Sequence, residues 1–195
     1  SRVATSVAVT VQAAYATNLV TFNDPAYMQR NADIVSPDVG DLLIYTRFRV
    51  LDDANRQTIW SNGASAHYVK YYGSTELRVD LPVIGLKRII DLSMQVGDDI
   101  DILASMRQAT GTVRCWYNIE NAGWAEGFNE KHSWTTLGLS LGIFHIGVDQ
   151  DDLGHQFLSS LARVYVKTGV WADPSDVSVQ RKFANVLGGM ADPDD

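Results

Sequence analysis

One five-residue segment matches the pattern of a hydrolase nucleophile. Residues 138–142 read Gly-Leu-Ser-Leu-Gly, which fits the G-x-S-x-G motif with Ser140 as the nucleophile. That motif needs a sharp turn between a strand and a helix, with an acid and a histidine supplied later by the same sheet. Here residues 143–148 are apolar and typical of a strand, and Asp149 and His155 lie too close together to come from separate positions in a sheet. We interpret the segment as a strand interrupted by glycines.

A pair of carboxylates with the spacing needed for acid–base chemistry occurs at Asp99 and Asp101. Glycoside hydrolysis uses two carboxylates that flank one bond, and acid-x-acid spacing puts both on one face of a strand. The strand that begins here turns Ile100 and Ile102 inward, so we expect the two aspartates to be solvated turn acids. The sequence therefore predicts no catalytic residues, and we expect a protein that is not an enzyme.

An incomplete calcium-binding pattern lies at residues 149–154. Acids occupy its first and third positions and glycine its sixth, but Leu153 stands at the fifth position and Ser160 at the twelfth, where a bidentate acid is needed. A Ca²⁺ site that uses remote ligands such as Asp52 or Asp53 stays open, and the metal ligands are unknown. No other cofactor is indicated, because the four histidines lack the spacing of a zinc site: His67, His132, His145 and His155.

Aromatic side chains flank two short polar segments in the middle of the chain. An exposed tryptophan beside polar groups can stack on a sugar ring or anchor a protein partner. We predict that the residues that bind a ligand or partner are Trp124, Phe128, Asn129 and Trp134, with protein partners favoured over glycans. The alternative is that Trp116 and Trp134 belong to the core and that Trp124 alone is exposed.

Composition and charge narrow the classes of partner. The chain has 195 residues, 46% hydrophobic and 20% charged, which is typical of a folded globular domain, and we assign residues 1–195 to one domain. Its net charge of -7 and its lack of a Lys/Arg cluster argue against nucleic acid and anionic membranes as partners. No apolar stretch reaches transmembrane length, so we expect no membrane insertion. The lone Cys115 alternates with Val113 and Tyr117, which predicts a buried structural thiol.

The elements that must position these residues are mostly short strands. Aspartate outnumbers glutamate by 19 to 4, and together with 15 glycines this is typical of many turns between short elements. Apolar and polar residues alternate with a period of two in about eight to ten segments. The sequence predicts an all-β fold, an antiparallel β-sandwich of the jelly-roll kind, with a hairpin break at 109–112 and strands within 3–11, 42–50, 67–72, 76–81, 100–106, 113–119, 139–146 and 161–166.

One short helix is expected near the C-terminus, over residues 173–187. Asp173 can cap its first turn, and Asp176 would face the positive end of the helix dipole. A pair of glycines follows and would end the helix. Residues 190–195 are then expected to form an acidic tail.

Several segments, taken in order, resemble the laminin-G-like, concanavalin A-like jelly-roll superfamily: residues 22–30, 41–50, 58–63, 110–118, 141–147 and 157–166. The stretch from Trp171 to Phe183 resembles the end of such domains in structural proteins of tailed phages. This resemblance implies a non-enzymatic virion protein, made in the host cytoplasm, that is a capsid decoration or cement protein or a tail or fibre component. Its partners would be other virion proteins, and it would form homo-oligomers.

The superfamily also implies an alternative function, a lectin-like module that binds carbohydrate and recognises host glycans. No sugar-binding or metal-binding motif of the superfamily can be matched here residue by residue, so the fold alone does not name a ligand. An exposed aromatic platform at Trp124 would favour this alternative.

Overall fold

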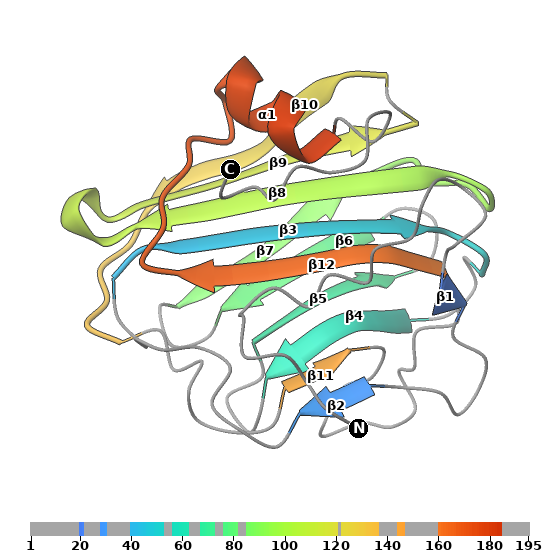
Figure 1. Ribbon diagram of the computed structural model, residues 1–195, viewed down its shortest axis with the longest axis horizontal. Coiled ribbons are helices and arrows are strands. Elements are labelled where there is room, and N and C mark those ends of the chain that lie inside the picture. The colour runs from blue at the N-terminus through green and yellow to red at the C-terminus, as the bar shows by residue number, and fades with distance from the viewer. Residues whose placement is uncertain are drawn as a thin grey trace.

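The computed structural model is a sandwich of two six-stranded antiparallel β-sheets with a short helix on one outer face (Figure 1). This architecture confirms the predicted all-β sandwich with a short C-terminal helix. The structure describes residues 20–21, 28–30, 40–52, 56–62, 67–72, 76–81, 85–120, 122–136, 144–146 and 160–184.

Each sheet combines neighbouring hairpins with strands from distant parts of the chain. The front sheet has the order β1-β12-β3-β8-β9-β10, with strands Val20–Thr21 (β1), Leu42–Arg49 (β3), Asp99–Arg107 (β8), Thr112–Ile119 (β9), Trp124–Lys131 (β10) and Ser160–Thr168 (β12). The back sheet has the order β2-β11-β4-β5-β6-β7, with strands Met28–Arg30 (β2), Arg56–Asn62 (β4), His67–Tyr72 (β5), Glu76–Leu81 (β6), Leu86–Asp91 (β7) and Phe144–Ile146 (β11).

The main hydrophobic core lies between the two sheets, because each sheet turns one apolar row inward. Ile44 and Phe48 of the front sheet and Trp60 and Leu77 of the back sheet are among its fully buried members. Cys115 of β9 belongs to the same core and is completely buried, and this burial raises the pKa of its thiol. The prediction of a buried structural thiol is confirmed.

The C-terminal helix α1, Val177–Ala184, begins later than the sequence predicts. Asp176 caps the helix, since its Oδ1 accepts hydrogen bonds from the backbone N–H and the hydroxyl of Ser178, both at 2.7 Å. Asp173 instead accepts a bond from the backbone N–H of Ser175 at 3.0 Å and closes the turn before the helix. Two aspartates three positions apart can each serve as a cap, and the second one does. The predicted helix end at 187 and the tail at 190–195 lie outside the described residues.

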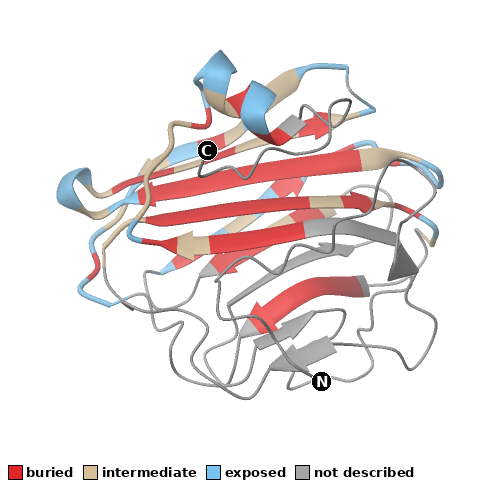
Figure 2. Ribbon diagram, in the orientation of Figure 1, coloured by how far each residue is buried: buried red, intermediate tan, exposed pale blue. Residues whose placement is uncertain are grey.

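A second apolar cluster lies on the outer face of the front sheet, the face turned away from the back sheet. It joins Leu43 and Tyr45 of β3, Leu103 of β8 and Tyr165 of β12 to Phe183 of α1. The ring centroid of Phe183 lies 5.0 Å from that of Tyr45 and 5.9 Å from that of Tyr165. Because β3 and β8 are covered on both faces, they are buried along almost their whole length (Figure 2).

The expected hairpin break at 109–112 is present between β8 and β9. A short 3-10 helix, Gln108–Thr110, leads into Gly111, which adopts the left-handed conformation with φ of 63°. A Cβ at this glycine would lie 2.3 Å from the backbone oxygen of His132, so a side chain has no room here. This hairpin therefore depends on glycine for its conformation and for its close packing.

Among the strands that the structure describes, the period-two pattern misses β1, β2, β4, β7 and β10. In β10 the alternation is interrupted because the pairing with β9 shifts between Glu126 and Phe128, which makes a β-bulge. The other predicted strands within the described residues are present, and of the one predicted at 139–146 the structure describes only 144–146. The strand expected at 3–11 lies outside the described residues.

Replacing Gly111 by alanine tests the hairpin. We expect Gly111→Ala to lower the free energy of unfolding by about 2–4 kcal/mol, because it adds a backbone clash to the cost of a left-handed residue. Gly169→Ala is the matched control: this glycine also has a positive φ, of 72°, but nothing lies within 4 Å of its Cβ position. The control should cost only about 1 kcal/mol. Urea unfolding followed by tryptophan fluorescence measures both, and equal losses would contradict the clash.

Candidate functional site

A continuous row of polar side chains crosses the outer face of the front sheet beside α1. The strand registers place Trp124 of β10 opposite Asn118 of β9, Asn118 opposite Asp101 of β8, and Asp101 opposite Arg47 of β3. Residues that face one another across neighbouring strands are in direct reach of each other. Four strands from two distant parts of the chain, residues 42–49 and 99–131, thereby contribute to one row.

The centre of the row is the buried carboxylate of Asp101, which is 1% exposed. The hydroxyl of Tyr45 donates a hydrogen bond to its Oδ1 at 2.6 Å, the amide of Asn118 approaches its Oδ2 at 3.5 Å, and Arg47 lies 3.8 Å away. Burial raises the pKa of Asp101, and the positive charge of Arg47 and the bond from Tyr45 oppose that shift. The expectation that this aspartate is a solvated turn acid is therefore wrong.

A second polar row lies next to the first and closer to solvent, and it consists of Arg49, Asp99 and Glu120. Arg49 donates two hydrogen bonds to Asp99, at 2.8 and 2.9 Å, in the bidentate geometry that guanidinium and carboxylate groups favour. Asp99 also lies 3.6 Å from Arg47, so it joins the two rows and is not a free turn acid. Its backbone N–H donates to the carboxylate of Glu120 at 2.5 Å.

Glu120 has an unusual backbone conformation for its residue type. Its φ of 52° lies in the left-handed region, which residues other than glycine rarely occupy. The backbone N–H of Glu120 donates to the carbonyl of Asp99 at 2.9 Å, and this bond holds Glu120 beside the ion pair of Arg49 and Asp99. Strained residues of this kind are concentrated at functional sites. The strain points to this end of the sheet as the part of the surface to test.

We call the solvent-accessible part of these rows the open end, and it consists of Arg49, Asp99, Glu120 and Trp124. The side chains of Arg49 and Asp99 are 32% and 21% exposed, Glu120 is exposed and Trp124 is half-buried. The open end thus presents acceptors, a planar donor group and an indole on one surface. That combination suits a polar ligand that also has an apolar face.

The four residues predicted to bind a ligand or partner are not brought together. Trp124 lies at the open end and packs against the outer apolar cluster. Phe128 and Trp134 are each only 8% exposed and belong to the main core, and the indole N–H of Trp134 donates to the carbonyl of Gly40 at 3.1 Å. The predicted set is corrected in this respect, because residues 124–131 form a strand that turns Phe128 inward.

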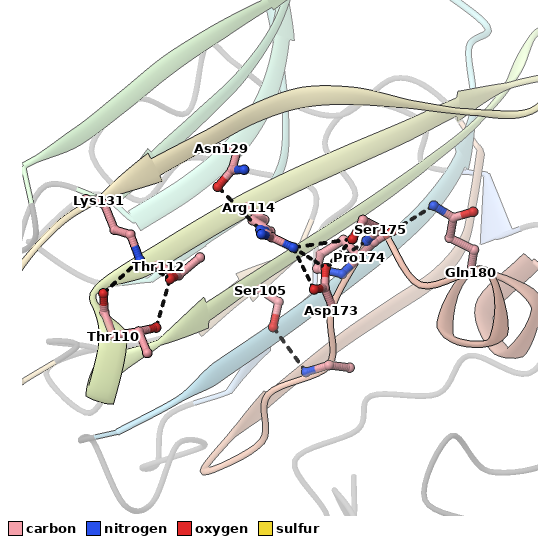
Figure 3. A network of polar contacts seen from close by, with 11 residues as sticks. Ser105, Thr110, Thr112, Arg114, Asn129, Lys131, Asp173, Pro174, Ser175 and Gln180 are labelled. Atoms are coloured by element: carbon pink, nitrogen blue, oxygen red, sulfur yellow. Dashed lines mark hydrogen bonds and ion pairs between the residues drawn. The ribbon is translucent and has the colours of Figure 1, made fainter.

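Asn129 lies further along β10, in a network that holds the C-terminal segment (Figure 3). Arg114 of β9 donates to the side chain of Asn129 at 3.3 Å and, through Nη1, to both carboxylate oxygens of Asp173, at 2.7 and 2.6 Å. The backbone N–H of Ala172 donates to the hydroxyl of Ser105 at 3.3 Å. These contacts fasten the segment before α1 across the sheet, so Asn129 serves a structural network.

The sequence also suggested metal and nucleophile motifs, and most of these lie outside the described residues. That applies to the segments 138–142 and 149–154 and to Asp53. Asp52 is described, and its backbone carbonyl accepts a hydrogen bond from Gln57 at 2.6 Å. Within the described part of the chain, no three His, Cys, Asp or Glu side chains are grouped so that they could hold a metal ion. No helix in that part is long and apolar enough to cross a membrane.

Comparisons with known proteins bear on the fold. No family model and no curated protein matches the sequence. Among solved structures, the CBM40 of the Ruminococcus gnavus IT-sialidase, bound to α2,3 sialyllactose, is similar with a TM-score of 0.55 and 10% identity, over 75% of this chain and 94% of that one. A Bacteroides ovatus protein proposed to bind carbohydrate gives a TM-score of 0.57 and 12% identity, over 76% and 42% of the two chains.

The laminin α2 chain supplies a further match in its LG1-3 region. The TM-score is 0.50 and the identity 7%, over 72% of this chain and 30% of that one. Together the three similarities show that the chain has the jelly-roll fold shared by concanavalin A-like, laminin G-like and CBM40 domains. The corresponding part of the sequence-based resemblance is confirmed. At these identities the comparisons establish the fold and no ligand.

Tyr45→Phe tests whether the buried carboxylate depends on its hydroxyl partner. We expect a loss of about 1.5–3 kcal/mol in the free energy of unfolding, because a buried charged group loses a hydrogen bond that water cannot replace. Tyr117→Phe, which removes a hydroxyl from a half-buried tyrosine of β9, is the control and should change stability by less than about 0.5 kcal/mol. Thermal and urea unfolding measure both variants. Equal small effects would show that Asp101 does not need the Tyr45 hydroxyl.

Asp173→Asn tests the attachment of the C-terminal segment through its pH dependence. Partial burial alone would raise the pKa of Asp173, but hydrogen bonds from Ser175 and Arg114 lower it below its usual value. A lowered native pKa stabilises the fold above the unfolded-state pKa, and that stabilisation is lost as the pH falls through the native pKa. The side chain is 37% exposed, so we expect the variant to lose only about 0.5–1 kcal/mol at pH 7.

The difference between wild type and Asp173→Asn should shrink as the pH is lowered from about 4 toward 2. Urea unfolding at both ends of this range measures it. Glu126→Gln, an exposed change on β10, should leave stability unaltered at both. A deficit of the Asn variant that stays constant down to pH 2 would contradict a role for the ionised carboxylate.

Proposed function

We propose that this chain is a non-enzymatic, lectin-like module that binds a carbohydrate at the open end of the front sheet. The observation that carries the proposal is that Trp124 and the ion pair of Arg49 and Asp99 lie on the same outer face of the front sheet of a jelly-roll fold. Two similar structures support it, since one is a complex with sialyllactose and the other is a protein proposed to bind carbohydrate.

The chemistry of the open end suits a sugar. A sugar ring offers neighbouring hydroxyl groups along its edge and C–H groups on its face. Asp99 and Glu120 can accept from hydroxyl donors, Arg49 can donate to hydroxyl or carboxylate oxygens, and the indole of Trp124 can pack against the C–H face.

The buried groups behind the open end keep it in one arrangement. Arg47 bridges Asp99 and Asp101, and Tyr45 and Asn118 hold Asp101 in turn. A site whose polar groups are fixed before the ligand arrives loses less conformational entropy on binding. The network therefore favours affinity without contacting the ligand.

The virion hypothesis is the second candidate, and it stays a prediction. It depended on the stretch from Trp171 to Phe183, and in the structure much of this stretch makes contacts within the chain. Ala172 and Asp173 bond to the front sheet, and Phe183 fills the outer apolar cluster. These residues are thus explained by packing of the chain on itself, which reduces their weight as evidence for a capsid or tail partner.

A glycan array that spans neutral and acidic sugars tests the proposal, followed by calorimetry on the strongest ligand. We expect Trp124→Ala to weaken binding at least about tenfold, since truncating a tryptophan that anchors a partner commonly costs about 2 kcal/mol or more. Glu120→Gln should weaken binding by a smaller factor, because it preserves shape and alters only charge.

Asn129→Ala is the matched control for the glycan experiment. It lies on the same strand as Trp124 but in the network of Arg114, away from the open end, so binding should be unchanged. A wild-type chain that binds no sugar on the array would sink the proposal. Loss of binding in the Asn129 variant, with none in the Trp124 variant, would move the site to the other end of the strand.

A further inference from the structure

Strand β7 is the last strand of the back sheet, so one of its edges has no neighbouring strand among the described residues. Its side chains Lys87, Ile89 and Asp91 are exposed and point away from the core, while Leu86 and Ile90 are buried. Ile89 is 48% exposed, so the row presents a large apolar side chain between its two charged ones. The exposed row therefore reads cation, apolar, anion along the strand.

This row is complementary to itself in one antiparallel register. When two copies of β7 meet about a two-fold axis through Ile89, each Ile89 faces its counterpart, and each Lys87 faces Asp91 of the other copy. If the two-fold axis is to keep each face of the sheet on the same side, the numbers of two facing residues must add up to an even value. The pair can therefore be centred on any residue of β7, but not between two residues. Centring the pair on Lys87, Arg88 or Asp91 would instead bring like charges together, and centring it on Ile90 would pair Ile89 with Asp91.

The contacts inside the chain leave the charge of Asp91 uncompensated. Across the β6–β7 pair, Asp91 lies opposite Glu76, and Lys87 lies opposite Asp80. Like charges in directly opposed positions are destabilising. Neither Lys87 nor Asp91 forms an ion pair with any residue that the structure describes. A cation on the open side of β7 would offset the repulsion between Asp91 and Glu76.

The inward side of β7 is already fixed within the chain. Arg88 forms an ion pair with Glu130 of β10, with Nη2 to Oε2 at 2.6 Å, and Glu130 also contacts His132 at 3.0 Å. Ile90 packs near Gly127 of β10, where a Cβ would lie 2.6 Å from its Cδ1. The edge is therefore held in place by the front sheet before any partner arrives.

We propose that β7 is the interface of a two-fold homodimer, in which β7 pairs with β7 of a second copy in the register centred on Ile89. The pairing joins the two back sheets into one continuous sheet, with Lys87 and Asp91 forming reciprocal ion pairs on both sides of the Ile89 contact. Charged residues on an edge commonly prevent strand pairing. Here their symmetric placement opposes the registers centred on Lys87, Arg88 and Asp91, and the register centred on Ile89 is the one that forms ion pairs. The proposal does not depend on carbohydrate binding.

Sedimentation equilibrium over a range of protein concentrations tests the dimer with the wild type and Asp91→Lys. The substitution separates effects inside the chain from effects between copies. Within the chain it puts a cation opposite Glu76, so the stability of the monomer should be equal or higher. Between copies it places the new lysine opposite Lys87 of the other copy, in both of the symmetric contacts. The repulsion between these ammonium groups should raise the dimer Kd about tenfold or more. Val177→Lys, at an exposed position on α1, should leave the Kd unchanged.

The double variant Lys87→Asp with Asp91→Lys reverses both charges and restores opposite pairs between the copies. We expect it to recover most of the affinity that Asp91→Lys alone loses. Far-UV circular dichroism and a melting curve confirm that each variant folds. A wild type that stays monomeric at every concentration, or a dimer whose Kd is unaffected by Asp91→Lys, would overturn the proposal.

Cysteine cross-linking reads the register directly. Opposed residues in an antiparallel pair have Cβ atoms about 4.5–5.5 Å apart, so mild oxidation of Ile89→Cys should link two copies readily. In the same register a cysteine in place of Lys87 would lie about 13 Å from its counterpart, so Lys87→Cys should link at least about tenfold more slowly. The native Cys115 is fully buried and supplies no background. Equal rates at the two positions would place the interface elsewhere.

Discussion

The front sheet must be covered on both faces, because its central strands carry apolar side chains on each side. In β3 the neighbours Leu43 and Ile44 are both buried, although they point in opposite directions. The back sheet covers one direction, and Phe183 and the segment before it cover the other. The rest of the architecture follows: the C-terminal helix lies where the second apolar face needs it, and the polar rows lie where that cover ends.

Much of the fold could be predicted from local sequence, because the alternation in segments such as 42–50, 76–81 and 113–119 reflects inward and outward residues directly. The helix start was misplaced because Asp173 and Asp176 are equally good caps by residue type. In the structure Asp173 is bonded to Arg114, which no local pattern can bring near, and Asp176 caps the helix. Strand β10 was missed for a related reason, since a bulge at Gly127 interrupts its alternation and makes it look like a loop.

The candidate site was harder to predict than the fold. The spacing of Asp99 and Asp101 correctly put both on one face, but the sequence could not say what covers that face. The partners of Asp101 are Tyr45 and Arg47, which β3 supplies from far away in the chain. Of the three aromatic residues predicted to bind, only Trp124 lies on this face, and Phe128 and Trp134 belong to the core. Residue type indicated which side chains could bind a ligand. The pairing of distant strands determines which of them lie on the surface.

The pairing of β3 with β12 has a consequence for how the chain folds. Leu42 is aligned with Thr168, so one of the central contacts of the front sheet joins residues that leave the ribosome far apart in time. Until β12 and Phe183 are available, Leu43, Tyr45 and Leu103 have no cover on the outer face. Folds dominated by such distant pairings form slowly, and their uncovered intermediates are prone to associate. The same segment that completes the native sheet therefore sets how long the nascent chain remains exposed to aggregation.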